Sequence, residues 1–440
     1  MRRTAPIFQR IDWFTAAAVM ALMIIGLFNV ASATSGADAV DWFDWGNKQG
    51  KQIIWVAIGI LFAATILLIE GEFFIKTAVI HYGFNLLTLL AVLAIGKTIG
   101  GAKSWFSFGN VGIQPSEFAK TGTALMLAWL LSRTSEKIAT RDNLIKAIIV
   151  IGIPAGLILL QPDAGTVLVF GGLIFVFYRE GLSGNVLIGV FSALLITVAT
   201  ILTGANQLNY PVIGSHSAAF VLWGVLLGIG LILWITTPYW IVPRRRKFVR
   251  RVILISGIAS IGFSGMLHGG MEKVLKPHQR DRIHVLFGID VGNPDADYNI
   301  RHSKAAIGSG SWTGKGFLQG PMTAYGFVPE QETDFIFCTI GEEWGFFGSS
   351  FVLILFTGLL VRILMLAERQ RSAFTRIYAY GVASILFMHY LINVGMVIGL
   401  APVIGIPLPF VSAGGSSLIG FTLLIFILLR LDAERFTVLR

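Results

Sequence analysis

The 440-residue sequence has a single cysteine and little charge. One cysteine, Cys338, cannot form a disulfide within the chain, and it excludes a cluster of thiolate metal ligands. Only 13% of the residues are charged, against roughly 25% in an average soluble domain. A soluble chain of this length needs more charge than this to cover its surface. The composition therefore excludes a cytosolic enzyme, a disordered protein and a small secreted module.

Hydrophobic residues, by contrast, make up 55% of the chain. A membrane-spanning helix needs about 20 mostly apolar residues, and about twelve runs come near that length. These runs are 12–32, 52–69, 74–96, 116–132, 146–161, 165–180, 185–203, 218–237, 249–267, 336–366, 376–400 and 415–431. We therefore expect an all-α polytopic integral membrane protein with about 10–12 transmembrane helices. The first run is longer than the apolar core of a signal peptide, which predicts a retained helix.

The net charge of +10 comes from basic residues that gather in particular loops, so it gives no reason to expect a nucleic-acid partner. Basic residues gather before the first run and in alternate loops after it. They are Arg2, Arg3 and Arg10; Arg133, Lys137 and Arg141; Arg244, Arg245, Arg246, Lys247, Arg250 and Arg251; Arg369 and Arg371; and Arg430, Arg435 and Arg440. The positive-inside rule then predicts that both termini are cytoplasmic.

The segment 268–335 is long, lies on the predicted outer side and is nevertheless basic, with Arg280 and Lys304 among its cations. Long loops escape the positive-inside rule, so a merely tolerated loop is one interpretation. The other is a cationic surface that binds an anionic ligand at the outer face.

Polar side chains recur in segments predicted to lie at the same outer face. In 96–120, Trp105 is an interfacial anchor or part of a site. Glu117 either caps a helix that begins at Pro115 or pairs with Lys120, which is three residues away on the same helical face. Ionisable groups inside a span usually face a cavity or each other.

Three more stretches carry candidate chemistry. Asp163 is an N-cap or a carboxylate at the mouth of a cavity. Asp334 is the last carboxylate before a long apolar run that also contains Glu342 and Glu343. Desolvation there would raise a carboxylate pKa toward that of a general base, and the other interpretation is a helix cap with solvated loop charges. Three prolines interrupt 402–417, which is either a surface connection or a re-entrant loop. The seven histidines show no metal-ligand spacing.

With these motifs in place, the sequence resembles the SEDS family (shape, elongation, division and sporulation) of peptidoglycan polymerases. Within the family, Leu275–Ile283 and Gly314–Leu318 are more similar to the elongation branch than to the division branch. Ala413 departs from the family, which usually has Tyr at this position. The matching motifs, in family order, are 101–105, 114–120, 161–166, 306–310, 328–330, 333–337, 341–345, 393–396 and 407–412.

The resemblance implies a bacterial enzyme of the cytoplasmic membrane that joins lipid II units by inverting glycosyl transfer and releases undecaprenyl diphosphate. It implies Asp334 as the essential carboxylate, which we assign as general base. Around it the expected cavity contains Trp105, Glu117, Lys120, Asp163, Arg280, Lys304 and Ser412. It also implies a class B penicillin-binding protein and the elongation machinery as partners. No cofactor is evident, although Mg²⁺ or Mn²⁺ would suit a diphosphate leaving group.

We expect residues 1–440 to form a single transmembrane domain, with 268–335 as a long extracytoplasmic loop. The family core has about ten spans, so we place an extra helix pair within 185–248. Two rival functions stay open at this point. One is a lipid II flippase or other transporter, and the other is a non-catalytic scaffold for the penicillin-binding protein.

Overall fold

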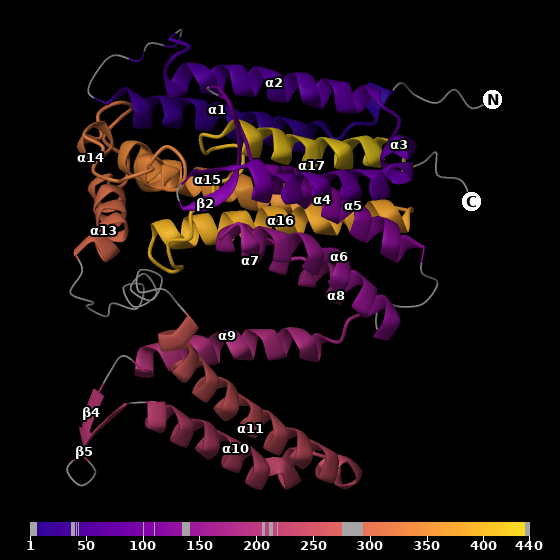
Figure 1. Ribbon diagram of the computed structural model, residues 1–440, viewed down its shortest axis with the longest axis vertical. Helices are drawn as coiled ribbons and strands as arrows, with labels where there is room; N and C mark the ends of the chain where they lie inside the picture. Colours follow the sequence, from indigo (N-terminus) through magenta and orange to yellow (C-terminus); the bar gives the residue numbers. More distant parts are fainter. Residues whose placement is uncertain are drawn as a thin grey trace. The chain divides into compact units, whose positions relative to one another are not determined.

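The computed structural model describes most of the chain as two compact units, Met1–Leu182 with Asn299–Arg440, and Ser183–Tyr298 (Figure 1). The described residues are 7–36, 40, 42, 44–99, 101–109, 111–133, 141–204, 207–210, 214–217, 219–274 and 294–435.

Every predicted apolar run overlaps helix, although the run 165–180 is divided between two short helices. The helices are α1 (Trp13–Ser35), α2 (Lys48–Leu68), α4 (Ala78–Ile95), α5 (Pro115–Ser132), α6 (Arg141–Leu160), α7 (Ala164–Gly171), α8 (Ile174–Arg179), α9 (Gly184–Gly204), α10 (Ala219–Trp240), α11 (Pro243–Val274), α15 (Ile336–Glu368), α16 (Ala373–Val397) and α17 (Gly415–Ala433). Among the described residues, ten helices are long and apolar enough to cross a membrane. The predicted fold class is thus confirmed. Helix α5 is not among the ten because polar residues fill its first half, and α7 and α8 are short.

Shorter elements connect these helices. They are η1 (Ile7–Gln9), α3 (Gly71–Lys76), α13 (Pro294–Ser309), α14 (Pro321–Ala324), the strands β1 (Lys97–Ile99), β2 (Ala102–Phe108) and β3 (Val111–Ile113), and the hairpin β4 (Gln207–Tyr210) and β5 (Gly214–Ser217). Strands β1, β2 and β3 form one antiparallel sheet in that order. An all-α prediction omits this sheet. Its turns contain Gly101 at φ 85° and Gly109 at φ 60°, a conformation that glycine adopts at little cost.

Helix α17 is the most buried of the long helices and lies among α1, α2, α5 and α16 (Figure 1). Ion pairs tie its C-terminal end to the start of α1 and the end of α15. Asp12 accepts hydrogen bonds from Arg362, and Asp432 accepts from Arg369. Both carboxylates are buried, so the arginines compensate their desolvation. Arg362 and Arg369 lie toward the C-terminal end of α15, whereas Asp334 comes just before its first residue. These ion pairs and Asp334 therefore lie at opposite ends of α15.

The second part of the segment between α16 and α17 is buried, whereas Leu400 in its first part is 77% exposed. Ile406, Leu408 and Val411 are each at most 2% exposed, which excludes a plain surface connection. A Cβ built on Gly26 would lie 2.6 Å from the Val411 carbonyl oxygen. Since Gly26 is nine residues before Ser35, the end of α1, the segment reaches about 14 Å along that helix. We call residues 398–414 the re-entrant loop.

The predicted long outer loop, 268–335, contains the end of α11, then α13 and α14. Residues 275–293 lie outside the described part of the chain. The predicted extra helix pair in 185–248 covers α9, α10 and the beginning of α11. Its status as an addition to the family core, and the single-domain assignment, stay predictions.

Candidate active site around Asp334

Asp334 lies in a turn just before α15, and three contacts fix the backbone around it. Asn393 Nδ2 donates to the Asp334 carbonyl oxygen at 2.9 Å and to the Ile406 carbonyl oxygen at 2.7 Å. Ser412 Oγ donates to the Thr333 carbonyl oxygen at 2.5 Å. Helix α16 and the re-entrant loop therefore hold Asp334 from two directions.

The Asp334 carboxylate itself is half-buried and faces the re-entrant loop. A Cβ built on Gly405, at φ 76°, would lie 3.0 Å from Asp334 Oδ2, so a side chain there would crowd the carboxylate. Within the described residues, the Asp334 carboxylate makes no hydrogen bond or ion pair. Its oxygens are thus available to a ligand.

The surroundings of the Asp334 carboxyl favour its neutral form more strongly than water would. Burial raises the pKa of the Asp334 carboxyl to about 7. The nearby negative charges of Glu330, Glu332 and Asp163 act in the same direction. Glu332 is itself buried and paired with Lys48. A carboxyl with a pKa close to 7 can both accept and return a proton at neutral pH.

Glu117 and Lys120 form the buried ion pair that their spacing predicts. Lys120 Nζ lies 2.8 Å from Glu117 Oε2, and the two residues are 2% and 3% exposed, respectively. Lys120 Nζ also lies 2.9 Å from His389 Nε2 and 4.6 Å from the centre of the Phe421 ring. Helices α5, α16 and α17 therefore meet around one buried cation.

Asp163 combines both roles that the sequence left open. Its carboxylate caps α7 by accepting from Thr166 N at 3.0 Å and Thr166 Oγ1 at 2.8 Å. It also accepts from Gln114 Nε2 at 3.2 Å, just before α5. Gly165, two residues on, packs against Ile404 of the re-entrant loop. Asp163 is therefore an N-cap whose negative charge also reaches Asp334.

Trp105 lies on β2, half-buried, with its ring against the backbone of Gly112 on β3. Ser416, at the start of α17, donates to the Gly112 carbonyl oxygen at 3.0 Å and accepts from Gln114 N at 3.2 Å. The small sheet is thus attached to α17, and Trp105 is held by it. This placement fits both an interfacial anchor and a wall of the site.

Lys304 lies on α13 with its side chain exposed and its end packed along Gly399 of the re-entrant loop. Next to it, Ser303 Oγ donates to the Val397 carbonyl oxygen at 2.5 Å, which fixes α13 on the end of α16. Arg280, the other predicted cation, lies outside the described residues.

Glu342 and Glu343 have a structural role. Glu342 accepts from Met322 N at 2.9 Å and from Thr323 N at 2.8 Å, and Glu343 accepts from Leu318 N at 3.1 Å. Both carboxylates are buried beneath residues 314–323. They satisfy the amides of this glycine-rich segment, so Asp334 is left as the carboxylate available for chemistry.

His389 and Asn393 are not among the predicted site residues, although Asn393 begins the motif 393–396. They lie one turn apart on α16 and both contact the re-entrant loop, since His389 Nδ1 lies 3.2 Å from the Pro407 carbonyl oxygen. The available signal was their spacing of four residues within an apolar span, where polar side chains usually have a function.

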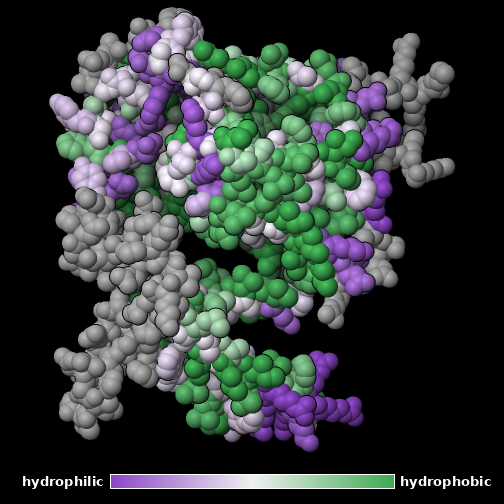
Figure 2. Space-filling view, in the orientation of Figure 1, coloured by the Kyte–Doolittle hydropathy of each residue, from purple (hydrophilic) through white to green (hydrophobic). Residues whose placement is uncertain are grey.

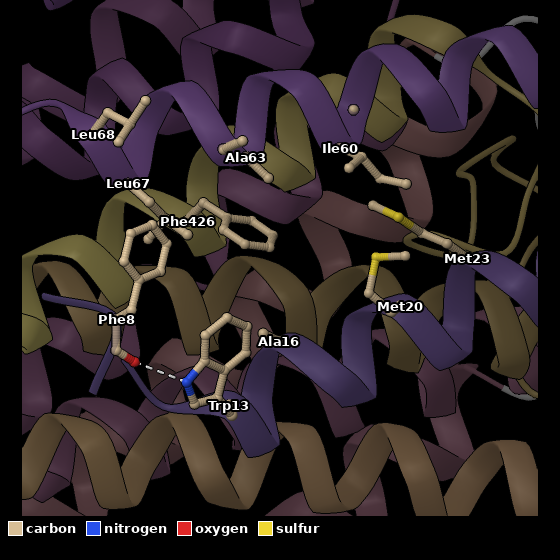
Figure 3. Close-up of a pocket in the computed structure, with 12 residues that line it drawn as sticks. Phe8, Trp13, Ala16, Met20, Met23, Ile60, Ala63, Leu67, Leu68 and Phe426 are labelled. Carbon is tan, nitrogen blue, oxygen red and sulfur yellow. Dashed lines mark hydrogen bonds between the residues drawn. The ribbon is translucent and has the colours of Figure 1, made fainter. Parts of the chain in front are cut away.

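A separate apolar pocket lies between α1, α2 and α17, near the beginning of α1 (Figure 3). Phe8 and Trp13 close one side of it, and the Trp13 indole donates to the Phe8 carbonyl oxygen at 2.9 Å. Its remaining lining is also apolar, so it offers no acid–base chemistry. In the part of the chain that the structure describes, no group of three or more His, Cys, Asp or Glu side chains could hold a metal ion.

The FtsW/RodA/SpoVE family model, described as a cell cycle protein, matches residues 12–212 and 218–436. The chain is 32% identical to the peptidoglycan glycosyltransferase RodA of Treponema pallidum, over 92% of this chain and 94% of that protein. It is 32% identical to the peptidoglycan glycosyltransferase MrdB of Escherichia coli, over 86% and 85%. Relatives named FtsW are less similar.

A solved structure, described as "Structural coordination of polymerization and crosslinking by a peptidoglycan synthase complex", contains a chain with the same fold. The TM-score is 0.68 at 25% identity, over 97% of this chain and 98% of that one. The family match spans nearly all of the described helices, including those that carry Lys120 and His389, and the turn that carries Asp334. The protein is therefore an integral membrane member of the FtsW/RodA/SpoVE family, the SEDS family.

Proposed function

We propose that the protein is a peptidoglycan glycosyltransferase that polymerises lipid II at the outer face of the bacterial cytoplasmic membrane during elongation. The observation that carries the proposal is the placement of Asp334. Its carboxylate has no partner among the described residues, it is held by α16 and the re-entrant loop, and its pKa is about 7. The glycosyltransferase names of the relatives support the same reaction.

In this reaction, Asp334 accepts the proton of the acceptor sugar hydroxyl as its oxygen attacks the anomeric carbon of the donor. The bond between that carbon and the diphosphate oxygen breaks, and undecaprenyl diphosphate leaves with the electron pair. Attack from the face opposite the leaving group inverts the anomeric configuration. The raised pKa makes Asp334 a stronger base than an exposed aspartate, while a useful fraction stays ionised at neutral pH.

The remaining residues bind and orient the substrate. Lys304 and Arg280 hold the diphosphate through charge-assisted hydrogen bonds. Trp105 bounds the sugar site, and Glu117, Lys120 and Asp163 set its electrostatic field. Ser412 fixes the backbone beside Asp334 and acts through it. A divalent cation at the diphosphate stays a prediction, which a chelator tests directly.

Basic residues support the orientation with both termini in the cytoplasm. Arg362 and Arg369 lie at the end of α15 opposite Asp334, so Asp334 then faces the outside. The similar chain in a peptidoglycan synthase complex supports a class B penicillin-binding protein as the partner that crosslinks the product.

A lipid II flippase and a non-catalytic scaffold are the alternatives. A transporter is expected to place its ionisable site near the middle of the membrane. Asp334 instead lies outside α15, at its end. A scaffold needs no carboxylate held free of partners at this position.

The test is lipid II polymerisation by the purified full-length protein with its penicillin-binding partner, the transpeptidase being blocked by a β-lactam. We expect glycan strands from wild type and none from Asp334→Asn, which preserves size. Strands from a folded Asp334→Asn variant would overturn the assignment of the base. Lack of strands from wild type, with lipid II translocation in vesicles, would favour the flippase.

A further inference from the structure

The junction of α10 and α11 carries a dense group of basic residues with no acidic residue nearby in the sequence. Six of the eight residues from position 244 to 251 are basic. No aspartate or glutamate occurs between Glu180 and Glu272. We call Arg244, Arg245, Arg246, Lys247, Arg250 and Arg251 the junction cluster. Figure 2 shows it as a hydrophilic end on two otherwise hydrophobic helices.

In the other unit, Met1–Leu182 with Asn299–Arg440, several arginines are neutralised by carboxylates. Five of them form ion pairs with carboxylates of their own unit: Arg179 with Glu368, Arg362 with Asp12, Arg369 with Asp432, Arg376 with Glu180, and Arg430 with Glu434. The junction cluster has no such pair among the described residues. Among the described residues of its own unit, Ser183–Tyr298, the cluster is therefore open to a counter-charge from outside the protein.

Two members of the cluster have internal roles, and four face outward. Arg246 donates to the Ile241 and Pro238 carbonyl oxygens at 3.0 and 2.9 Å, closing the end of α10. Arg250 lies 5.5 Å from the centre of the Trp234 ring. The remaining four side chains, Arg244, Arg245, Lys247 and Arg251, are exposed.

Large aromatic side chains flank the exposed cations. Tyr239 is 88% exposed, Trp240 54% and Phe248 69%. Aromatic residues next to basic ones are typical of the membrane–water interface, where rings lie at the level of the headgroups. Clusters of four to eight Lys or Arg beside a membrane helix attract anionic lipids.

We propose that the junction cluster binds the headgroups of anionic phospholipids such as phosphatidylglycerol. The exposed guanidinium groups of Arg244 and Arg245 contact the phosphate, the Lys247 ammonium adds long-range attraction, and Tyr239 and Trp240 lie among the headgroups. The junction cluster shares no residue with the site around Asp334 and needs no catalytic turnover, so the proposal stands or falls independently of the proposed function.

The experiment is native mass spectrometry of the full-length protein, titrated with equal amounts of phosphatidylglycerol and phosphatidylcholine. We expect wild type to retain mainly phosphatidylglycerol. Arg244→Gln with Arg245→Gln is expected to reduce this retention about tenfold. Arg244→Lys with Arg245→Lys retains most of it, because the charge is kept. Salt of about 1 M, which screens charges beyond about 3 Å, weakens it in wild type.

The matched control is Arg179→Gln with Arg376→Gln, which removes the same charge from arginines that are already paired. It is expected to retain phosphatidylglycerol as wild type does. Thermal unfolding in detergent verifies that each variant is folded. The proposal is overturned if wild type retains both lipids equally, if the Gln pair at 244 and 245 binds as wild type, or if the control loses as much lipid. An acidic protein segment would then be the better occupant.

Discussion

Lys120 Nζ lies 2.9 Å from His389 Nε2, while the other ring nitrogen of His389 lies 3.2 Å from the Pro407 carbonyl oxygen. A carbonyl oxygen can only accept, so Nδ1 carries the proton. Nε2 is then an acceptor for the Lys120 ammonium. His389 is thus a neutral bridge from the buried ion pair to the re-entrant loop, which also contacts Asp334 through Gly405.

Two substitutions of His389 should distinguish the hydrogen-bonding role of its side chain from a packing role. His389→Leu removes the acceptor from a buried ammonium, at a cost of about 1.5–3 kcal/mol for a hydrogen bond to a charged group. We expect polymerisation to fall about 10- to 100-fold. His389→Gln, which can accept from Lys120, is expected to recover much of the rate at a similar melting temperature. Equal activity of the Leu and Gln variants would show that only the volume of the side chain matters.

The pH dependence of polymerisation should follow Asp334. The general base works in its ionised form, and burial together with neighbouring carboxylates raises its pKa to about 7. Activity is therefore expected to rise with pH through about 7 and to fall about tenfold for each pH unit below it. Initial rates between about pH 5 and 8.5 test this. A profile that is flat across this range would mean that Asp334 is not the titrating group.

Replacing only one residue of the Glu117–Lys120 ion pair should destabilise the protein more than replacing both. Lys120→Met leaves Glu117 buried and uncompensated, which costs about 3–5 kcal/mol. In Glu117→Gln with Lys120→Met, no charge remains, so we expect most of that stability to return. Unfolding of the three proteins in detergent gives the comparison. A double variant as unstable as the single one would show that packing around Lys120, rather than charge, dominates.

The close approach of the re-entrant loop to α1 makes Gly26 intolerant of a side chain. In Gly26→Ala the new Cβ would lie 2.6 Å from the Val411 and 2.7 Å from the Phe410 carbonyl oxygens, so helix or loop must move. We expect a loss of stability of about 2 kcal/mol or more, and of activity with it.

Gly83→Ala is the control for this substitution. Gly83 lies on α4 and has nothing within 4 Å of a built Cβ. Alanine there is expected to be neutral or stabilising by up to about 1 kcal/mol, because it restricts the unfolded chain. Similar melting temperatures for the Ala variants at 26 and 83 would contradict the close packing of the loop.

The sequence predicts the helices and the Glu117–Lys120 pair well, because apolar length and a spacing of three residues are local properties. It does not predict contacts between residues that are distant in the sequence. His389 meets Lys120 across 269 residues, and Ser412 meets Thr333 across 79. Glu342 illustrates the same limit, since its position in an apolar span favours a base, whereas the amides of residues 322 and 323 occupy it.

Helix α1 has a further consequence for biogenesis. Asp12 caps its start locally through Thr15, but the charge of Asp12 is matched by Arg362, which is 350 residues later. At its far end, Ser32 donates to Glu343, which is 311 residues later. The face around Gly26 is covered by Phe410 and Val411, later still. Because a chain is made from its N-terminus, we expect α1 to be synthesised before these partners exist and to reach its final packing only when α15 and the re-entrant loop have followed it.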